Sequence, residues 1–410
     1  MKKIILAFLA LSFVFSSCLR DEVVTKYTFY RPVYKTSEQA RAEIKSYAPV
    51  EIIHPGKIYY KDGYVFLNEL QKGIHVIDIR NVQQPTRVGF IKIPGCVDMA
   101  VRGTILYADM FTDLIALDIS NPLDVKRTQI VEGAFPENYY NGFLVGKDKV
   151  ITEWIRVDTT VLQKDYVSWM GRVKAEGGVF ALAGGDSRGG ISNGTGGSMA
   201  RFALNEDRLY TVSHSDLKVF NVSNPEKPAF VKSNPIGWNI ETIFPYGKNL
   251  FIGSMSGMYI FDVSNKDNPV QKSVFEHARV CDPVIADGNF AYVTLRNGTE
   301  CLGFINQLDV VDVTDLTKPK LIKSFPMTNP HGLSKDGDLL MICDGKDGLR
   351  FLDAKNPRDI RTIHLMKGMN TFDVIAIKGI AIVTAEDGLY FIDYKDPFNP
   401  KITSSFKINI

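Results

Sequence analysis

The sequence contains few of the residues from which metal centres and disulfide scaffolds are built. Its 410 residues include six His and five Cys. None of the His belongs to a metal-binding motif, and the zinc-hydrolase signature HExxH is absent. Cys281 and Cys301 flank one predicted hairpin and could form a disulfide, with buried free thiols as the alternative. We expect no metal, no other cofactor and no disulfide-dense fold.

The chain also lacks a strong charge of either sign, and it lacks helical periodicity. Its 48 Lys and Arg nearly balance 46 Asp and Glu, whereas a nucleic-acid partner usually requires a concentrated basic surface. We therefore expect no nucleic-acid partner. Ten-residue stretches with a 3.6-residue apolar period are absent, which excludes a helical solenoid. The only long apolar run lies at the beginning of the sequence.

That run has the features of a bacterial signal peptide. Lys2 and Lys3 precede an apolar segment at 4–15 that is interrupted only by Ser12. The segment is too short to span a bilayer, which takes roughly 20 apolar residues. It ends in Phe-Ser-Ser followed by Cys18, which resembles the lipobox of bacterial lipoproteins. We predict a signal peptide at 1–17 and a lipid on Cys18, with an ordinary secretory peptide as the alternative.

The residues after Cys18 predict a membrane tether. Leu19, rather than Asp, follows the cysteine, which resembles the outer-membrane lipoproteins of Gram-negative bacteria. Thr36 and Gln39 have the spacing of a helix capping box, so the tether at 18–50 should contain a short helix. We expect an outer-membrane lipoprotein that faces the periplasm or the cell surface, with the membrane as a partner through Cys18.

One phrase recurs along the rest of the chain. An apolar strand ends in Asp or Asn, one or two small polar residues follow, and Pro usually comes next. Successive copies are 40, 103, 41, 50, 41 and 40 residues apart, so five of the six separations are close to one period. We call the strand-ending residues the marker residues: Asp78, Asp118, Asn221, Asp262, Asp312, Asp353 and Asp393.

Each repeat also contains four short apolar runs separated by turn signals. Residues 331–366, for example, divide at Asp-Gly and Asn-Pro pairs into four such runs. Four short strands joined by tight turns are typical of a propeller blade. The predicted fold is therefore all-β, a β-propeller of four-stranded blades over residues 51–410.

The number of blades depends on residues 137–198, which lack the recurring phrase. Their first two apolar runs align with the upstream halves of the other repeats, so we predict eight blades, the third being irregular. Treating the stretch as an insertion leads to the alternative of seven. A Gly-rich insertion is expected at about 157–198, and no GK[ST] motif for phosphate binding follows it.

The marker carboxylates predict turns rather than active sites. A short carboxylate at a strand end can accept hydrogen bonds from the backbone of the following turn, and Pro fixes the φ angle there. Asn221 provides the same acceptor without a charge. This substitution fits a turn better than it fits chemistry.

The repeats resemble the LVIVD repeat, which is named for its apolar strand ending in Asp. The forms in this chain are VIDI, ALDI, IFDV and VVDV. The resemblance covers roughly residues 50–408, with a gap at 137–198. It implies a β-propeller of the bacterial envelope, and it carries no established catalytic residues to transfer.

The mouth of the central channel is the predicted ligand site. The innermost strand of each blade ends there, so one position per repeat converges on the axis. Aligning the repeats on the Gly of the first hairpin brings polar residues of both signs to this position. These residues either line a ligand site or bond to one another and to channel water. These residues are Lys57, Asp98, Arg201, Glu241, Asp282, His331 and Asp373.

These features favour a binding module over an enzyme. We expect a non-enzymatic, envelope-anchored propeller that binds a protein or a glycan through its loops. The alternative is a propeller hydrolase or lyase that uses Asp282, His331 and Asp373 at the channel mouth. A propeller fold by itself does not decide between these functions.

Overall fold

The computed structural model describes residues 24–136, 148–162, 165–166, 168–170, 179–180, 198–277, 283–297 and 305–408. The chain divides into two units. One contains residues 1–35 and 140–185, and the other contains residues 36–139 and 186–410. In the described part of the chain, no helix is long and apolar enough to cross a membrane.

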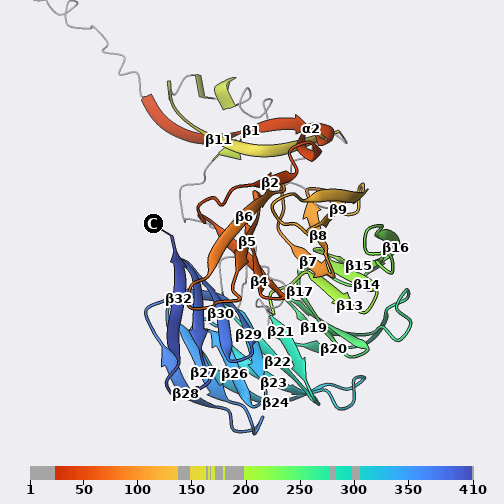
Figure 1. Cartoon of the computed structure of the whole chain (residues 1–410), viewed down its shortest axis with the longest axis vertical. Coiled ribbons are helices and arrows are strands. Elements are labelled where there is room, and N and C mark those ends of the chain that lie inside the picture. Colours follow the sequence, from red (N-terminus) through yellow and green to blue (C-terminus); the bar gives the residue numbers. More distant parts are fainter. Residues whose placement is uncertain are drawn as a thin grey trace, which may run out of the picture. The chain divides into compact units, whose positions relative to one another are not determined.

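Antiparallel four-stranded sheets form the blades of a propeller in the second unit (Figure 1). Blade 1 contains β3 (Pro55–Lys61), β4 (Tyr64–Glu69), β5 (Gly73–Asp78) and β6 (Thr86–Lys92). Blade 2 contains β7 (Met99–Arg102), β8 (Ile105–Met110), β9 (Asp113–Asp118) and β10 (Lys126–Val131). Blade 3 contains β13 (Phe202–Asn205), β14 (Arg208–Val212), β15 (Asp216–Asn221) and β16 (Ala229–Pro235).

The remaining blades repeat the same order. Blade 4 contains β17 (Ile240–Tyr246), β18 (Asn249–Ser254), β19 (Gly257–Asp262) and β20 (Val270–Glu276). Blade 5 contains β21 (Val284–Asp287), β22 (Phe290–Leu295), β23 (Gln307–Asp312) and β24 (Lys320–Pro326). Blade 6 contains β25 (Leu333–Asp336), β26 (Leu339–Cys343), β27 (Leu349–Asp353) and β28 (Arg361–Met366). Blade 7 contains β29 (Thr371–Ile377), β30 (Ile380–Ala385), β31 (Gly388–Asp393) and β32 (Lys401–Lys407).

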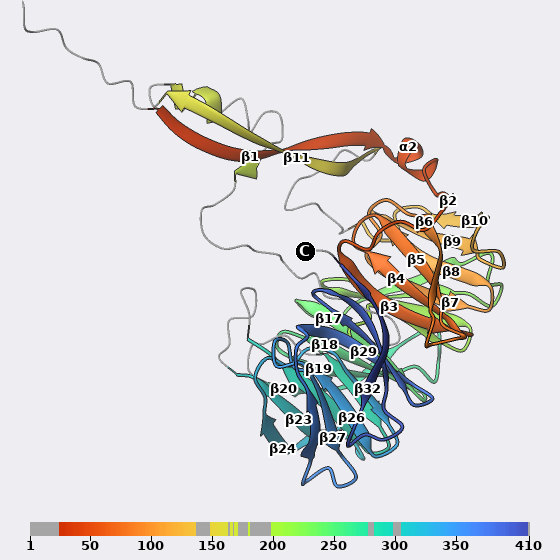
Figure 2. The same cartoon turned by 60° about the vertical axis from the view of Figure 1, so that its left-hand side comes forward.

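The blades form a closed ring of seven, so the predicted eight blades are wrong and the alternative of seven is right. The first strand of each blade contacts the first strand of the next, and β29 of blade 7 contacts β3 of blade 1 (Figure 2). The ring closes through apolar packing: Ile58 and Leu67 of blade 1 pack against Ile382 and Phe391 of blade 7. Strands covered on both faces read as continuous apolar runs, which is why the repeats could be recognised.

The residues assigned to an eighth blade instead contribute to a sheet of the first unit. Here β11 (Lys149–Leu162) lies beside β1 (Val24–Thr36), and β12 (Val179–Phe180) pairs with the other side of β1. Residues 24–36, which we expected in the tether, are therefore a strand. Its pairing with β11 was missed because that strand lies more than 100 residues away along the chain, as the hydrogen bond from Thr28 to Asp158 shows. The predicted signal peptide and Cys18 lie outside the described residues.

The expected short helix is present. Helix α2 (Ser37–Arg41) begins after Thr36, and both hydrogen bonds of the capping box with Gln39 are formed. The short strand β2 (Lys45–Tyr47) follows and adds a fifth strand outside β6 of blade 1. Arg41 at the end of α2 forms a salt bridge of 2.7 Å with Asp113 of blade 2.

The marker residues form turns, as predicted. In every blade the marker side chain accepts a hydrogen bond from the backbone N–H two residues later, at 2.7–3.0 Å. Asn221 makes the same bond as the carboxylates. The repeated carboxylates are therefore structural.

The connections between strands divide the propeller into two unlike faces. We call one the uniform face. Its connections between first and second strands hold two residues in all seven blades, and those between third and fourth strands hold seven residues in all seven blades. We call the other the variable face. There the connections between second and third strands hold two to eleven residues, and those between blades hold four to seventy. The longest, residues 132–201, leads from blade 2 to blade 3.

Candidate functional site

The two-residue turn of each blade fixes which residues are equivalent at the channel. The position five residues before that turn lies at the variable-face end of each first strand. It is occupied by Lys57, Asp98, Arg201, Thr242, Pro283, Gly332 and Asp373. The predicted residues Glu241, Asp282 and His331 each precede the equivalent position by one, and Asp282 lies outside the described residues.

Lys57 and Asp98 form a buried ion pair at this end of the channel. Their side chains are 1% and 3% exposed. Asp98 also accepts a hydrogen bond of 2.7 Å from the backbone N–H of Arg201, which joins blades 1, 2 and 3. Burial lowers the pKa of Lys57 to about 7, and the neighbouring Asp98 opposes this shift. Such a pair is costly to break, because either partner alone would be a buried, uncompensated charge.

The carboxylate of Asp373, from blade 7, lies close enough to Lys57 and Asp98 for both charges to shift its pKa. Burial raises its pKa to about 7, the backbone N–H of Val374 and the charge of Lys57 oppose the rise, and Asp98 adds to it. Its Oδ1 accepts the Val374 N–H at 3.0 Å. Its Oδ2 is buried and has no hydrogen-bond partner among the described residues. A buried acceptor of this kind is expected to hold a proton or to bind water or a ligand.

A short segment of the chain lies at the axis of the propeller. The Ser198 hydroxyl accepts the N–H of Leu333 in blade 6 at 2.8 Å. Two residues on, the Ala200 carbonyl accepts the N–H of Ile243 in blade 4 at 2.6 Å. Since Arg201 is bonded to blade 2, residues 198–201 contact three blades that are not neighbours. Only a position near the axis allows this, so we call residues 198–201 the axial segment.

His331 is buried and uncharged near the same end of the channel. Burial and the charge of Arg296 hold its pKa well below the usual value. Its Nε2 lies 3.1 Å from the Asn329 amide nitrogen, so Nε2 accepts and the proton is on Nδ1. The His331 ring packs edge-on against Phe372, with ring centres 5.5 Å apart. The backbone carbonyl of Glu241 accepts a hydrogen bond of 3.4 Å from Arg201 Nε.

Gly332 allows the carboxylate of Asp373 to lie against the backbone of blade 6. A Cβ at Gly332 would lie 2.3 Å from Asp373 Oδ1 and 3.0 Å from the Asp373 Cα. The backbone N–H of Gly332 donates to the Phe372 carbonyl at 2.9 Å. The absence of a side chain in blade 6 is therefore what makes room for the carboxylate of blade 7.

A second set of acids, which the sequence analysis did not single out, orders the variable-face connections. Asp109 accepts the backbone N–H groups of Val97 and Asp98, both at 2.8 Å, and burial raises its pKa to about 6. Glu69 and Asp344 cap the preceding connections in the same way. The signal was an acid within one residue of the end of the second strand. It was missed because not every repeat has one.

Trp238 is the most exposed large apolar side chain on the variable face. It is 77% exposed. Its neighbours hold its backbone in place: Gly237 has φ +157° and Asn239 has φ +55°. A Cβ at Gly237 would lie 2.6 Å from the Tyr259 hydroxyl, so only Gly fits there. The loop therefore presents an indole to solvent from a constrained backbone.

A pocket of about 320 Å³ lies between blades 2 and 3, lined in part by Ala134, Asp216, Lys218 and Phe230. Lys218 donates to the Ala134 carbonyl at 3.0 Å, and Ser215 donates to Asp216 at 2.6 Å. Ser215 and Lys218 have the SxxK spacing of some hydrolases, but they make no hydrogen bond to each other in this described region. The Gly-rich stretch also contains two GxSxG pentapeptides, at 185–189 and 190–194, which lie outside the described residues.

The structure describes no metal centre. Among the residues it places, no group of three or more His, Cys, Asp or Glu side chains is close enough to hold an ion. Cys96 and Cys343 are buried free thiols, and burial raises the pKa of both well above the usual value. The candidate disulfide between Cys281 and Cys301 lies outside the described residues.

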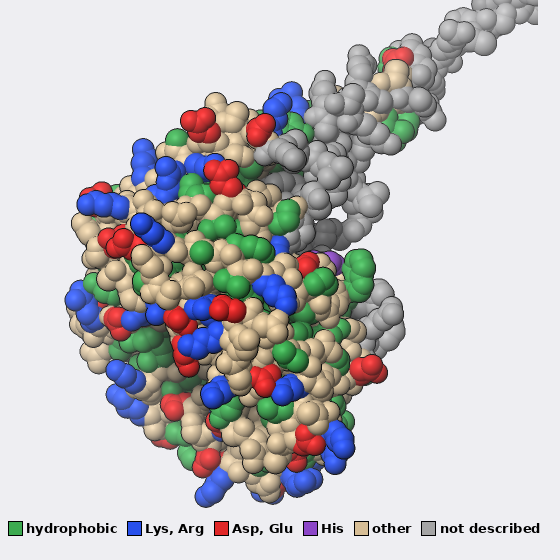
Figure 3. Space-filling model, turned by 90° about the vertical axis from the view of Figure 1, so that its right-hand side faces the viewer, with side chains coloured by type: hydrophobic (Ala, Val, Ile, Leu, Met, Phe, Trp, Pro, Cys, Tyr) green, Lys and Arg blue, Asp and Glu red, His purple; other side chains and the backbone are tan. Residues whose placement is uncertain are grey.

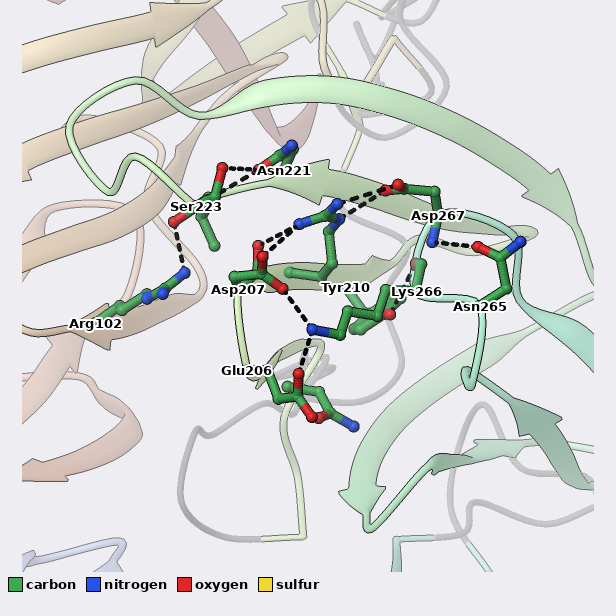
Figure 4. Close-up of polar contacts among 12 residues, drawn as sticks. Arg102, Glu206, Asp207, Tyr210, Asn221, Ser223, Asn265, Lys266 and Asp267 are labelled. Carbon is green, nitrogen blue, oxygen red and sulfur yellow. Dashed lines mark hydrogen bonds and ion pairs between the residues drawn. The ribbon is translucent and has the colours of Figure 1, made fainter.

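The densest ionic network on the uniform face is structural. Arg208 of blade 3 binds Asp267 of blade 4 through two nitrogens, at 2.6 and 3.0 Å (Figure 4). Lys266 pairs with Asp207 at 3.1 Å, and the Tyr210 hydroxyl donates to the Lys266 carbonyl at 2.8 Å. Because these bonds all join one blade to the next, the network works as a latch between blades 3 and 4.

The sequence model of the LVIVD repeat matches residues 242–276 and 279–326, which are blades 4 and 5. No curated protein sequence matches the chain. Among solved structures, a protein of unknown function from Desulfotomaculum acetoxidans is similar, with 11% identity, 84% of this chain and 95% of that chain covered, and a TM-score of 0.55. The periplasmic gluconolactonase PpgL of Pseudomonas aeruginosa has 12% identity, 94% and 97% coverage and a TM-score of 0.52.

The computationally designed protein Ika8 is similar to the same extent. It has 8% identity, 87% of this chain and 88% of that chain covered, and a TM-score of 0.54. At these identities the likeness concerns the fold alone. The chain is thus a β-propeller whose blades 4 and 5 match the LVIVD repeat.

Proposed function

We propose that this LVIVD-repeat propeller is a non-enzymatic binding module whose variable face contacts a protein or glycan ligand. The observation that carries the proposal is the segregation of connection lengths. All seven blades have the same two connection lengths on the uniform face, whereas the variable face has connections of up to seventy residues. Loops of irregular length on a rigid scaffold are where binding residues are usually found.

Two features of the variable face support a binding role. Trp238 offers an exposed aromatic surface on a constrained loop, and aromatic anchors of this kind often dominate binding energy. At the channel, the charged groups of Lys57 and Asp98 are paired with each other and with the axial segment. The paired channel mouth favours ligand contact through the outer parts of the loops.

The test is photo-crosslinking in the cells that make the protein, with a glycan array alongside it. A photoreactive phenylalanine replaces Trp238 on the variable face or, as the matched control, the exposed Glu226 in the blade 3 connection of the uniform face. We expect adducts, or array binding lost in Trp238→Ala, only for the variable-face position. Equal crosslinking from both positions, or array binding that Trp238→Ala leaves unchanged with no adduct at Trp238, would contradict the proposal.

We further propose that the protein is an outer-membrane lipoprotein anchored through Cys18. The apolar segment at 4–15 and the lipobox-like Phe-Ser-Ser-Cys18 support this. Metabolic labelling with a palmitate analogue should mark the wild-type chain and leave Cys18→Ala unlabelled. Labelling that persists in the variant would place the lipid elsewhere.

A hydrolase or lyase is the second candidate, and Asp373 is the observation that favours it. Its Oδ2 is buried without a described partner, and a pKa of about 7 suits a general acid or base. This candidate requires that Asp373→Asn abolish turnover of a glycoside, ester or lactone panel while Asp359→Asn, an exposed control, does not. If the wild-type protein turns over nothing in the panel, the enzyme candidate fails and the binding role remains.

A further inference from the structure

The outer rim of the propeller carries an uneven charge. In blades 5–7, the third-to-fourth connections and the fourth strands comprise residues 313–326, 354–366 and 394–407. These residues hold nine Lys and Arg against three Asp. The corresponding residues of blades 2–4, which are 119–131, 222–235 and 263–276, hold six Lys and Arg against four Asp and Glu. Residues 79–92 of blade 1 hold three Lys and Arg and no Asp or Glu, so the excess positive charge is largest from blade 5 through blade 7 to blade 1.

The basic side is one continuous surface, because neighbouring blades touch along it. Lys323 of blade 5 donates to the Arg358 carbonyl of blade 6 at 3.1 Å. His364 of blade 6 lies 3.1 Å from the Phe398 carbonyl of blade 7, within hydrogen-bond distance. We call residues 313–326, 354–366 and 394–407 the basic rim. On the face seen in Figure 3, which is the side of Figure 1 where β9 and β16 lie, basic and acidic side chains are interspersed instead.

Most of the positive charge on the basic rim is available to a partner. Lys320, Lys355 and Lys401, one in each blade, are exposed and form no salt bridge with a described residue. The marker carboxylates nearby already accept backbone N–H groups. With the marker residues counted, blades 5–7 carry nine positive and six negative side chains, and blades 2–4 carry six of each, because Asn221 is uncharged.

Exposed apolar side chains lie among these charges. Phe398 is 68% exposed at the tip of the blade 7 connection, and Leu321 and Ile402 are each 49% exposed next to Lys320 and Lys401. The Phe398 backbone is held by its N–H bond to Asp396 at 3.1 Å, in addition to the contact with His364. An ordered loop thus presents a phenyl ring to solvent beside lysines.

We infer that the basic rim docks on an anionic lipid surface. Lysines at such a surface are attracted to phosphate-bearing headgroups, and apolar side chains beside them enter the boundary between headgroups and acyl chains. A nucleic acid would use the charges but leave Phe398, Leu321 and Ile402 exposed, so the apolar side chains favour lipid. The inference does not depend on the ligand proposed for the variable face.

The experiment measures vesicle binding by the mature chain, residues 18–410 with Cys18→Ser, so that neither an attached lipid nor the apolar segment at 4–15 contributes. Vesicles of phosphatidylethanolamine with phosphatidylglycerol are compared with vesicles of phosphatidylcholine. We expect the anionic vesicles to bind at least about tenfold more strongly, and salt to weaken the binding. The triple variant K320E/K355E/K401E should lose about tenfold or more, and F398S roughly fivefold.

The matched control is K126E/K227E/K248E, which makes the same charge change at exposed lysines of blades 2–4. It should keep its binding within about twofold, and thermal unfolding should show that every variant is folded. Equal losses in both triple variants would overturn the inference, as would the absence of binding to anionic vesicles. Tight binding to duplex DNA that F398S leaves unchanged would assign the rim to a polyanion instead.

Discussion

The two faces of the propeller are made by the same four-stranded repeat, yet they are held together differently. On the uniform face each blade has the same two short connections. One is a two-residue turn, and the other is a seven-residue connection whose first turn is fixed by the marker residue. On the variable face the order comes from contacts between distant residues. Asp98, for example, accepts from Arg201 across a separation of 103 residues.

This difference separates local from tertiary stabilisation. A marker side chain replaced in one blade alters one turn, because its bond reaches only two residues along the chain. A charge replaced at the channel alters several blades at once, because the Lys57–Asp98 pair and the axial segment join them. A substitution in the same repeat should therefore cost little stability on the uniform face and much more at the axis.

The largest expected effect tests this contrast with two ion pairs. Asp98→Ala should destabilise the protein by about 3–5 kcal/mol, because Lys57 would remain buried without a partner. Asp267→Ala, in the half-exposed latch of the uniform face, should cost about 1 kcal/mol or less. Urea unfolding measures both free energies. The double variant Lys57→Met/Asp98→Leu should be more stable than Asp98→Ala, and equal costs for Asp98→Ala and Asp267→Ala would refute the contrast.

The next effect is a difference in pH dependence. The raised pKa of Asp373, about 7, means that the folded protein keeps a proton that the unfolded chain releases near the ordinary value of 3.8. The contribution of Asp373 to stability should therefore fall by roughly 2–4 kcal/mol as the pH rises from about 4 to about 7. Asp373→Asn should remove this part of the slope and leave the smaller part that Asp109 causes below about pH 6.

The uniform face should show the opposite sign. Hydrogen bonds from Ser264 and Lys272 lower the pKa of the marker Asp262 to about 2. Its contribution is present above pH 4 and is lost as the pH falls toward about 2. Unfolding free energies of Asp262→Asn and Asp373→Asn across the pH range separate the two, and a common pH slope in both variants would contradict the assignment.

Glycines provide a smaller test. Gly388, in a hairpin of the variable face, has φ +145°, and a Cβ there would lie 2.1 Å from the Phe406 carbonyl oxygen. Gly247, in a turn of the uniform face, has φ +58° and open space around it. Gly388→Ala should cost about 2–3 kcal/mol, and Gly247→Asn less than about 1 kcal/mol, since Asn tolerates this backbone conformation. Thermal unfolding measures both losses of stability. A larger loss in Gly247→Asn than in Gly388→Ala would contradict this packing.

The smallest effect concerns a single marker residue. Asp353→Asn should change stability by less than about 0.5 kcal/mol, because Asn221 already makes the same turn in blade 3. Asp353→Ala should cost about 1 kcal/mol, since the N–H of Lys355 loses its acceptor. Chemical denaturation of the pair measures the difference. A loss in Asp353→Asn as large as in Asp353→Ala would mean that the charge, rather than the acceptor, matters.

Part of the site could be predicted from the repeats alone. Aligning them placed Lys57, Asp98, Arg201 and Asp373 at one level of the channel, because one residue per repeat must reach the axis. Glu241, Asp282 and His331 were placed one residue away from the equivalent position, because the aligned Gly is the second residue of the two-residue turn in blades 1 and 7 but the first in blades 4, 5 and 6. The strand pairing decides where each turn begins, and the Gly alone does not reveal it.

The sequence by itself determined the strands, the turns and the LVIVD repeat, because these depend on residues within one period of each other. Only the tertiary structure decided the number of blades, since a ring closes where the last blade packs on the first, as Phe391 does near Ile58. It also placed Lys149–Leu162 beside β1, and residues 198–201 at the axis. Such pairings join segments more than 100 residues apart, and their free energy comes from burial that no local pattern records.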